Sequence, residues 1–175
     1  MNPVRRGRPG PTPRLTLREL ESRDAPFICE LLTDPGFLRY IGDRGVRDLD
    51  SARRYIEQGP RASYAANGFG LWAVERRDTG APIGICGLLK RDTLDDVDIG
   101  YAMLAAQGGA GFALEAAEAT LAWARDALGL RRVVAIVMPD NARSIRLLER
   151  LGMRFESHLP PDAAGAALSL YAWSV

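Results

Sequence analysis

The sequence predicts a single α/β domain built on a mixed, mostly antiparallel sheet. Three observations predict this class. Three strand-like runs follow one another closely between residues 70 and 104, and such short connections favour an antiparallel meander. A long helical pattern at 112–128 then precedes an apolar, β-branched run at 132–138, which indicates a buried strand reached by one parallel crossover. With 175 residues, the chain has the length of one domain with a substantial core.

The composition is that of a globular protein, with 47% apolar and 26% charged residues. Its 23 basic and 22 acidic side chains leave a net charge of +1, which gives no reason to expect a nucleic-acid partner. Cys29 and Cys86 are too few and too far apart for a metal pair or a disulfide framework, so both are expected to be buried and reduced. Without a signal-peptide pattern or a membrane-spanning run, the expected location is the cytoplasm.

Elements before residue 70 include one strand and two helices. Alternation at 15–20 predicts the strand. Ser22 and Asp24 can cap a helix at 25–33, which Asp34-Pro35-Gly36 interrupts. A second helix is expected from Asp48 or Asp50 towards Tyr64.

The rest of the chain completes the element order β-α-α-β-β-β-α-β-α-β-β. Six further strands are predicted at residues 70–76, 83–89, 97–104, 132–138, 153–157 and 168–175. Two further helices are predicted at residues 112–128 and 142–151.

The start of the chain is basic and proline-rich. Residues 1–13 contain Arg5, Arg6 and Arg8 together with four prolines. Such a segment is predicted to be a disordered tail, with a basic interaction arm as the alternative. The folded domain is therefore expected to span residues 14–175.

A glycine-rich segment at 107–111 leads into the helix at 112–128. The first turn of a helix leaves N–H groups unpaired and is electropositive, and Gly108, Gly109 and Gly111 let the main chain approach a phosphate. The segment matches neither a P-loop nor the dinucleotide fingerprint. Taken alone, it is equally typical of a flexible turn followed by tight helix packing.

Several separated motifs follow in a fixed order between residues 98 and 155. They are Asp98-Ile99-Gly100-Tyr101, Gly109-Ala110-Gly111-Phe112-Ala113, Gly129-Leu130-Arg131-Arg132-Val133, Pro139-Asp140-Asn141-Ala142-Arg143-Ser144 and Leu147-Leu148-Glu149-Arg150-Leu151-Gly152-Met153. In these residues the chain resembles the GCN5-related N-acetyltransferase (GNAT) superfamily, and most closely its RimJ/RimL-like branch of ribosomal-protein acetyltransferases. The resemblance implies a twisted sheet of about seven strands, flanked by about four helices, whose parallel fourth and fifth strands splay apart.

The resemblance also implies acetyl-CoA as cofactor, with CoA as product, and places the pantetheine arm between the splayed strands. It assigns main-chain bonds with this arm to Met103 and Leu104, and nearby contacts to Asn141 and Ser144. The pyrophosphate would be held by the N–H groups of Gln107, Gly108, Gly109, Ala110, Gly111, Phe112 and Ala113.

Attack of an amine on a thioester requires a neutral amine, a stabilised oxyanion and a departing thiolate. The resemblance implies that Asp98 removes the amine proton, often through water. Asp96 shares its face of the strand and is an alternative contributor. Asp98 could instead be an exposed carboxylate that positions the amine or pairs with an arginine. Together with Asn141 and Ser144, Asp98 forms the candidate catalytic set.

The chain departs from the superfamily at three positions. Gly108 and Ala110 replace the larger or basic residues common in relatives, so Arg143, Arg146 or another arginine would supply charge to the loop. Leu148 stands where many relatives carry a tyrosine acid. Ser144 is then either the group that protonates the thiolate or a residue that caps or back-bonds its helix.

The expected activity is transfer of acetyl from acetyl-CoA to a primary amine, either a protein N-terminal α-amine or a small molecule. A non-catalytic acetyl-CoA sensor and an enzyme for another acyl-CoA stay open as alternatives. Residues 35–47 and 157–167 are expected to determine the acceptor, which they do not identify.

His158 is expected at the surface, and Trp72 in the core or along the substrate cleft. The acidic group near residue 95 lacks calcium-loop spacing, so no metal is expected. A membrane partner is not expected either. The sequence does not decide whether the protein forms a homodimer.

Overall fold

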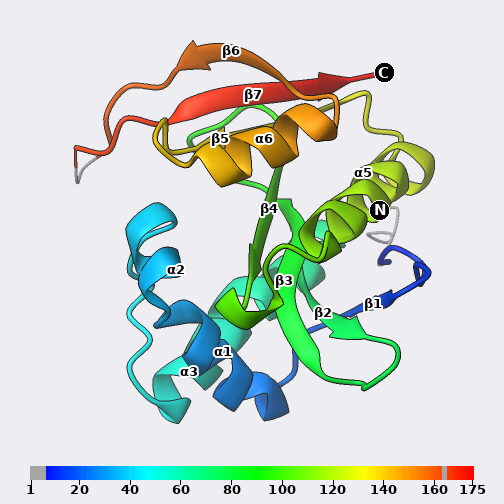
Figure 1. Ribbon diagram of the computed structural model, residues 1–175, viewed down its shortest axis with the longest axis vertical. Coiled ribbons are helices and arrows are strands. Elements are labelled where there is room, and N and C mark those ends of the chain that lie inside the picture. The colour runs from blue at the N-terminus through cyan, green and yellow to red at the C-terminus, as the bar shows by residue number, and fades with distance from the viewer. Residues whose placement is uncertain (1–6, 163–164) are drawn as a thin grey trace.

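The computed structural model describes residues 7–162 and 165–175, and its ribbon is shown in Figure 1. One seven-stranded sheet has the order β1-β2-β3-β4-β5-β7-β6. Its strands are β1 (Leu15–Arg18), β2 (Leu71–Arg76), β3 (Pro82–Leu89), β4 (Asp98–Met103), β5 (Arg132–Val137), β6 (Arg154–His158) and β7 (Ser169–Ser174). Every neighbouring pair is antiparallel except β4 and β5, which confirms the predicted mixed sheet with one parallel crossover.

The helices fall into two groups along the chain. Before β2 lie η1 (Ser22–Asp24), α1 (Ala25–Leu32), α2 (Pro35–Tyr40), α3 (Leu49–Ile56), the π-helical η2 (Glu57–Arg61) and α4 (Ala62–Asn67). After β4 lie the short 3-10 turn η3 (Ala105–Gln107), α5 (Phe112–Leu128) and α6 (Ala142–Arg150). All seven predicted strands occur, and their ends lie within two residues of the predicted ones. The described residues hold more helices than the four or so expected.

The additional helix α2 begins at the residues predicted to interrupt the chain. The break after α1 is confirmed, but the side chain of Asp34 also accepts hydrogen bonds from the N–H groups of Gly36 and Phe37, at 2.9 and 3.3 Å. Pro35 occupies the first turn, where its missing N–H costs nothing. The same Asp-Pro-Gly sequence therefore ends one helix and starts the next.

The predicted second helix is a composite of α3, η2 and α4. It begins at a capping box in which Asp48 accepts from the N–H of Ser51 at 2.8 Å and Ser51 Oγ accepts from the N–H of Asp48. Pro60 lacks an N–H for a regular α-helix, and the wider π-helical turn η2 accommodates it. Gly68, with φ 78°, then ends the run three residues beyond Tyr64 at Asn67.

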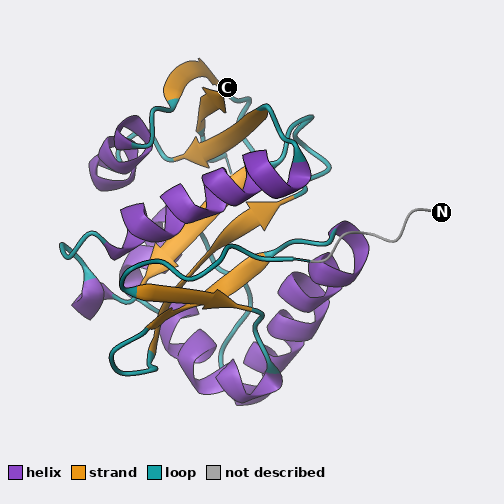
Figure 2. Ribbon diagram, turned by 90° about the vertical axis from the view of Figure 1, so that its right-hand side faces the viewer, coloured by secondary structure: helices purple, strands orange, loops and turns teal. Residues whose placement is uncertain are grey.

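Helices cover both faces of the sheet, as Figures 1 and 2 show. On one face, α1 and α3 bury a cluster that includes Ile28, Leu31 and Ile85. On the other face, α5 and α6 pack over a larger cluster that includes Trp72 and Leu148. The sheet therefore separates two cores.

Several singled-out side chains have clear positions. Trp72 is fully buried, so its predicted core role is confirmed and a place along a cleft is wrong. His158 is exposed at the end of β6, as expected. Cys86 is buried as predicted, whereas Cys29 is only partly buried; both thiols are free.

The parallel pair β4–β5 is joined at one register position only, Asp98 opposite Val134. There the N–H of Val134 donates to Val97 O at 3.0 Å. Beyond this point the strands diverge, while β3 pairs with β4, and β7 with β5, along their length. The predicted splay of the fourth and fifth strands is confirmed, and the sheet consists of two parts joined at its middle.

The segment before β1 lies against α5. Thr12 Oγ1 donates to Glu115 Oε1 at 2.6 Å, and the main-chain N–H of Arg14 donates to the same oxygen at 2.9 Å. Of the predicted tail at residues 1–13, residues 1–6 lie outside the described residues. From Gly7, whose N–H donates to Gly68 O at 3.4 Å, the chain follows the domain.

Strand β3 approaches the main chain before β2 closely at Gly87, where a Cβ atom would lie 1.9 Å from Gly70 O. Gly87→Ala is therefore expected to lower the free energy of unfolding by about 1–3 kcal/mol, because the two strands must separate. Urea denaturation measures this change. Gly10→Ala is the control, since a Cβ there meets nothing within 4 Å and the expected change is below about 0.5 kcal/mol. Equal midpoints for the two variants would contradict this packing.

Candidate active site

The diverging strands β4 and β5 lead at their carboxyl ends into the two loops that start α5 and α6 (Figure 1). Ligands of open sheets with parallel strands bind outside the carboxyl ends of those strands. The opening between β4 and β5, with the two helix N-termini, is therefore the first place to search for a site.

Only alternate residues of β4 direct their main-chain N–H and C=O groups towards this opening. The N–H of Leu104 donates to Ile83 O at 2.8 Å, and its carbonyl accepts from the N–H of Gln107 at 2.9 Å. Both groups of Leu104 are thus engaged within the protein, which counts against its predicted bond with a pantetheine arm. Main-chain groups of successive strand residues point to opposite sides, so those of Met103 and Tyr101 face β5.

The loop before α5 carries unpaired main-chain donors. Gly109 and Gly111 have φ values of 82° and 80°, a left-handed conformation that glycine adopts at low cost. The N–H groups of Gln107 and Gly108 close the turn of η3 by donating to Leu104 O and Ala105 O. Within the described part of the chain, the N–H groups of residues 109–113 have no acceptor. Five of the seven predicted donors are therefore available to an anion at the electropositive end of α5.

Two arginines border this loop. The guanidinium of Arg143 on α6 lies against Gly108, where a Cβ atom would be only 2.5 Å from one of its nitrogens. Arg14 donates to Ala110 O at 2.8 Å and forms an ion pair with Glu115 at 2.6 Å. Arg143 is thus the arginine that lies where the loop lacks a basic side chain of its own.

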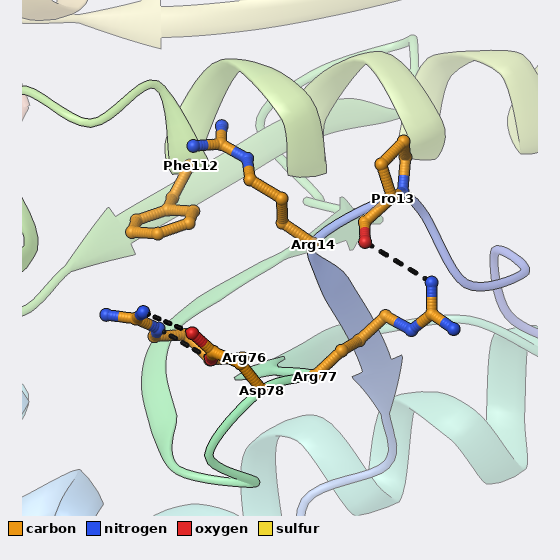
Figure 3. Close-up of a pocket in the computed structure, with 6 residues that line it drawn as sticks. All are labelled: Pro13, Arg14, Arg76, Arg77, Asp78 and Phe112. Carbon is orange, nitrogen blue, oxygen red and sulfur yellow. Dashed lines mark hydrogen bonds and ion pairs between the residues drawn. The ribbon is translucent and has the colours of Figure 1, made fainter.

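A hollow of about 140 Å³ lies beside the first residue of α5 (Figure 3). The ring of Phe112 packs between the guanidinium groups of Arg14 and Arg76, at 4.4 and 5.4 Å from its centre. Arg76 pairs with Asp78, and Arg77 donates to Pro13 O at 3.3 Å. The arginines here already bond neighbouring oxygens. Their contacts stabilise the start of α5, and the hollow is not an open anion site.

The start of α6 brings two candidate residues together. The Asn141 side chain accepts from the N–H of Ser144 at 3.2 Å and so caps α6. The hydroxyl of Ser144 lies 2.8 Å from Tyr101 Oη. This hydroxyl neither caps nor back-bonds the helix, but joins α6 to β4 across the opening.

Tyr101 is a residue whose role the sequence analysis missed, although it stands in the first quoted motif. Burial raises its pKa to about 12, against a smaller lowering by the Ser144 hydrogen bond, so the phenol stays protonated at neutral pH. Its partner Ser144 lies 43 residues away in the sequence. The only sequence signal for Tyr101 was its place in the motif at 98–101.

Asp98 lies at the point where β4 and β5 separate. Its side chain is 1% exposed, and its two oxygens accept from Arg91 Nε at 3.0 and 3.1 Å. Burial raises the pKa of this carboxyl, and the charge of Arg91 opposes that rise. The alternative of an exposed carboxylate is wrong, whereas pairing with an arginine is confirmed. Asp96 instead pairs with Arg132 at 2.9 Å near the sheet surface.

The three predicted catalytic residues do not form one cluster. Alternation along β4 directs Asp98 to the side covered by α1 and α3, and Tyr101 to the opposite side. Asn141 and Ser144 gather with Tyr101. The opening between the strands is thus bordered by a carboxylate on one face and by two hydroxyls on the other.

Several known proteins share this architecture. A family model described as an acetyltransferase (GNAT) domain matches residues 14–154. The uncharacterized N-acetyltransferase p20 of Bacillus licheniformis is 32% identical over 169 residues, covering 94% of this chain and 93% of that protein. An acetyltransferase from Agrobacterium tumefaciens has a TM-score of 0.79 and 29% identity over 94% of this chain and 92% of its own. RimJ from Mycobacterium smegmatis, solved in complex with CoA-disulfide, has a TM-score of 0.77 and 25% identity, covering 92% of this chain and 82% of its own.

The fold and the matched domain place the chain among the acetyltransferases. The chain belongs to the GNAT acetyltransferase family. Within the described ranges, no cluster of three or more histidine, cysteine or acidic side chains is arranged to hold a metal ion. No helix over the same ranges is long and apolar enough to cross a bilayer.

The hydroxyl pair between β4 and α6 has a measurable effect on stability. Tyr101→Phe is expected to lower the free energy of unfolding by about 1 kcal/mol, because one net side-chain hydrogen bond is lost. Ser144→Ala should cost less, since Ser144 O also accepts from Tyr101 Oη, at 3.3 Å. Chemical denaturation gives both values. Tyr40→Phe on α2 serves as the neutral control, and a Tyr101→Phe protein of unchanged stability would contradict the bridge.

Proposed function

We propose that this protein transfers an acetyl group from acetyl-CoA to a primary amine by direct attack on the thioester. The observation that carries this proposal is the row of five unpaired N–H groups at the start of α5, beside the opening between β4 and β5. An extended polar chain with a pyrophosphate at one end matches both features. Family membership supports the reaction class.

In this proposal the pantetheine arm lies along β4 and bonds the main chain of Met103, with the pyrophosphate on the N–H groups of residues 109–113. Arg143 adds the positive charge that Ala110 does not provide. The structure of RimJ with CoA-disulfide supports a CoA site in this fold. Main-chain donors hold the phosphates, so the departures at Gly108 and Ala110 are compatible with binding.

The chemistry divides between the two faces of β4. The amine nitrogen forms a bond with the thioester carbon, and its proton passes, directly or through water, to the carboxylate of Asp98. Burial makes this carboxylate a better proton acceptor than an exposed aspartate. The carbon–sulfur bond then breaks, and the leaving thiolate is stabilised by a hydrogen bond from the Ser144 hydroxyl, which in turn accepts from Tyr101 Oη. The thiolate takes its proton from water, and Asp98 returns its own proton to solvent.

We place the chain in the RimJ/RimL-like branch, and the similarity to RimJ from Mycobacterium smegmatis supports this. A ribosomal-protein-S5-alanine acetyltransferase from Vibrio fischeri and a spermidine N-acetyltransferase chimera share the fold at 17% and 21% identity. At such identities only the fold is shared, so protein N-termini and small amines both stay candidate acceptors. A cytoplasmic location and a homodimer stay predictions.

Calorimetric titration with acetyl-CoA tests the cofactor site. The unmodified protein is expected to bind in the micromolar range, and Gly111→Glu to abolish binding, because it adds a side chain and a negative charge at the N-terminus of α5.

Gly152→Glu is the matched control, because Gly152 has the same φ of 80° but follows the far end of α6. This variant should suffer the same backbone strain and keep its affinity for acetyl-CoA. Loss of binding in both variants would assign the effect to strain, and no binding by the unmodified protein would refute the proposal.

Asp98→Asn tests the proposed base. It should lower kcat/KM about 100-fold or more while leaving the affinity for acetyl-CoA unchanged. In the unmodified enzyme, kcat/KM should fall with decreasing pH as Asp98 is protonated, at a pH above the ordinary aspartate pKa because burial raises it.

Steady-state rates across pH with two acceptors of different amine pKa separate this limb from titration of the amine. The Asp98 limb stays fixed between acceptors, whereas the amine limb moves. Asp96→Asn, at the carboxylate paired with Arg132, is the control and should retain activity. An Asp98→Asn enzyme with a normal rate would remove this residue from the mechanism.

A further inference from the structure

A second hollow, of about 300 Å³, lies on the side of the sheet covered by α1 and α3. It is lined by Arg44, Gly45, Ser51, Arg54, Tyr55, Gln58 and Gly59. Two of these residues belong to the segment at 35–47, which the sequence analysis associates with acceptor choice. The hollow has the size of a small-molecule site.

The lining is positively charged. Arg44 donates only to Ile41 O, at 3.4 Å, and neither Arg44 nor Arg54 has an ion-pair partner among the described residues. Two neighbouring carboxylates are already engaged: Asp43 pairs with Arg47, and Asp48 caps α3 while lying within electrostatic reach of Arg54. Both guanidinium groups are therefore available to an anion.

The hollow owes its shape to the π-helical turn η2. Gln58 and Gly59 of this turn line it, and a Cβ atom at Gly59 would meet nothing within 4 Å. The turn is wide because Pro60 cannot donate a main-chain hydrogen bond, and π-helical turns occur frequently at functional sites. Without this widening, α3 would continue as a regular helix here.

Tyr55 lines the hollow on the side of the sheet towards which Asp98 points. Its ring packs on the cluster under α1 and α3. Burial raises the pKa of its phenol, and the charges of Arg44 and Arg91 oppose that rise, so both arginines act on the same group. Arg91 in turn bonds Asp98 at 3.0 Å. The hollow and the proposed base therefore lie on the same side of the sheet, and Arg44 and Arg91 both lower the electrostatic cost of a negative charge near Tyr55.

We propose that this hollow holds the acceptor, and that the acceptor is a small amine which also carries an anionic group, a carboxylate or a phosphate. Arg44 and Arg54 bind the anion, for which the planar guanidinium fork suits both chemistries. The amine is then directed towards Asp98. Polyamines are disfavoured, because a cationic lining repels them. This inference rests on the proposed acetyl transfer and names its substrate class.

The test compares acceptors in matched pairs that differ in the anionic group. Alanine is paired with alaninamide, and ethanolamine phosphate with ethanolamine; spermidine is the polycation. The anionic member of at least one pair should have a kcat/KM about 10- to 100-fold above its neutral partner, as expected for a charge-assisted hydrogen bond. Arg44→Gln combined with Arg54→Gln should abolish this preference.

Arg53→Gln is the control variant, since Arg53 lies on the same helix but pairs with Asp50 at 2.8 Å and does not line the hollow. It should keep the preference for the anionic acceptor. The three arginine side chains are exposed and lie outside both cores, so folding is unaffected. Calorimetric titration with acetyl-CoA is run on every variant, and each should bind as the unmodified protein does.

The outcomes separate the two proposals. If acetyl-CoA binds but spermidine or the neutral partners react faster, the inference is overturned and acetyl transfer stands. A preference for anionic acceptors that survives in the double variant also overturns it, as does an absence of turnover with every acceptor. If the titration shows no binding of acetyl-CoA, the proposed function itself is refuted, whatever the acceptor assays show.

Discussion

The single register contact between β4 and β5 is the constraint on which the rest of the structure depends. Two parallel strands need a crossover, and α5 supplies it. Because the strands then diverge, neither satisfies the inner main-chain edge of the other. The two parts of the sheet are held together instead by the packing of α5, by the Tyr101–Ser144 bridge and by the Arg39–Asp140 ion pair at 3.3 Å. An edge left open inside a protein accepts an extended chain as an additional strand would.

Asp98 stands at the branch point, and its position follows from the same constraint. It is the first residue of β4 and the one residue of this strand paired with both neighbouring strands, opposite Leu89 and Val134. A carboxylate this buried needs a charged partner, and Arg91 provides it. Strand pairing fixes the main chain while the arginine fixes the side chain, so the carboxylate has one orientation at the apex of the opening.

The sequence predicted elements with strong periodicity well and long-range partners poorly. Residues 112–128 form a helix with the predicted ends, because an apolar stripe and flanking glycines specify it locally. Helix α2 was missed, since Asp34-Pro35 is as typical of a turn as of a capped helix start. Neither the burial of Asp98 nor the bridge from Tyr101 follows from periodicity, because each depends on a contact between separate elements. The cofactor loop was identified by resemblance, but the engagement of Leu104 required the strand register.

The proposed cofactor side and acceptor side of the site differ in how well they tolerate amino-acid substitutions. On the proposed cofactor side, main-chain N–H groups and left-handed glycines would hold the anion, so a position such as Ala110 would tolerate variation as long as the backbone is kept. On the proposed acceptor side, recognition would depend on exposed side chains such as Arg44 and Arg54, which belong to neither core. Surface substitutions outside the core change stability little. Substitutions at the hollow would therefore change the choice of acceptor with little cost in stability. For this reason the shared fold identifies the reaction class, whereas the identity of the amine depends on these side chains.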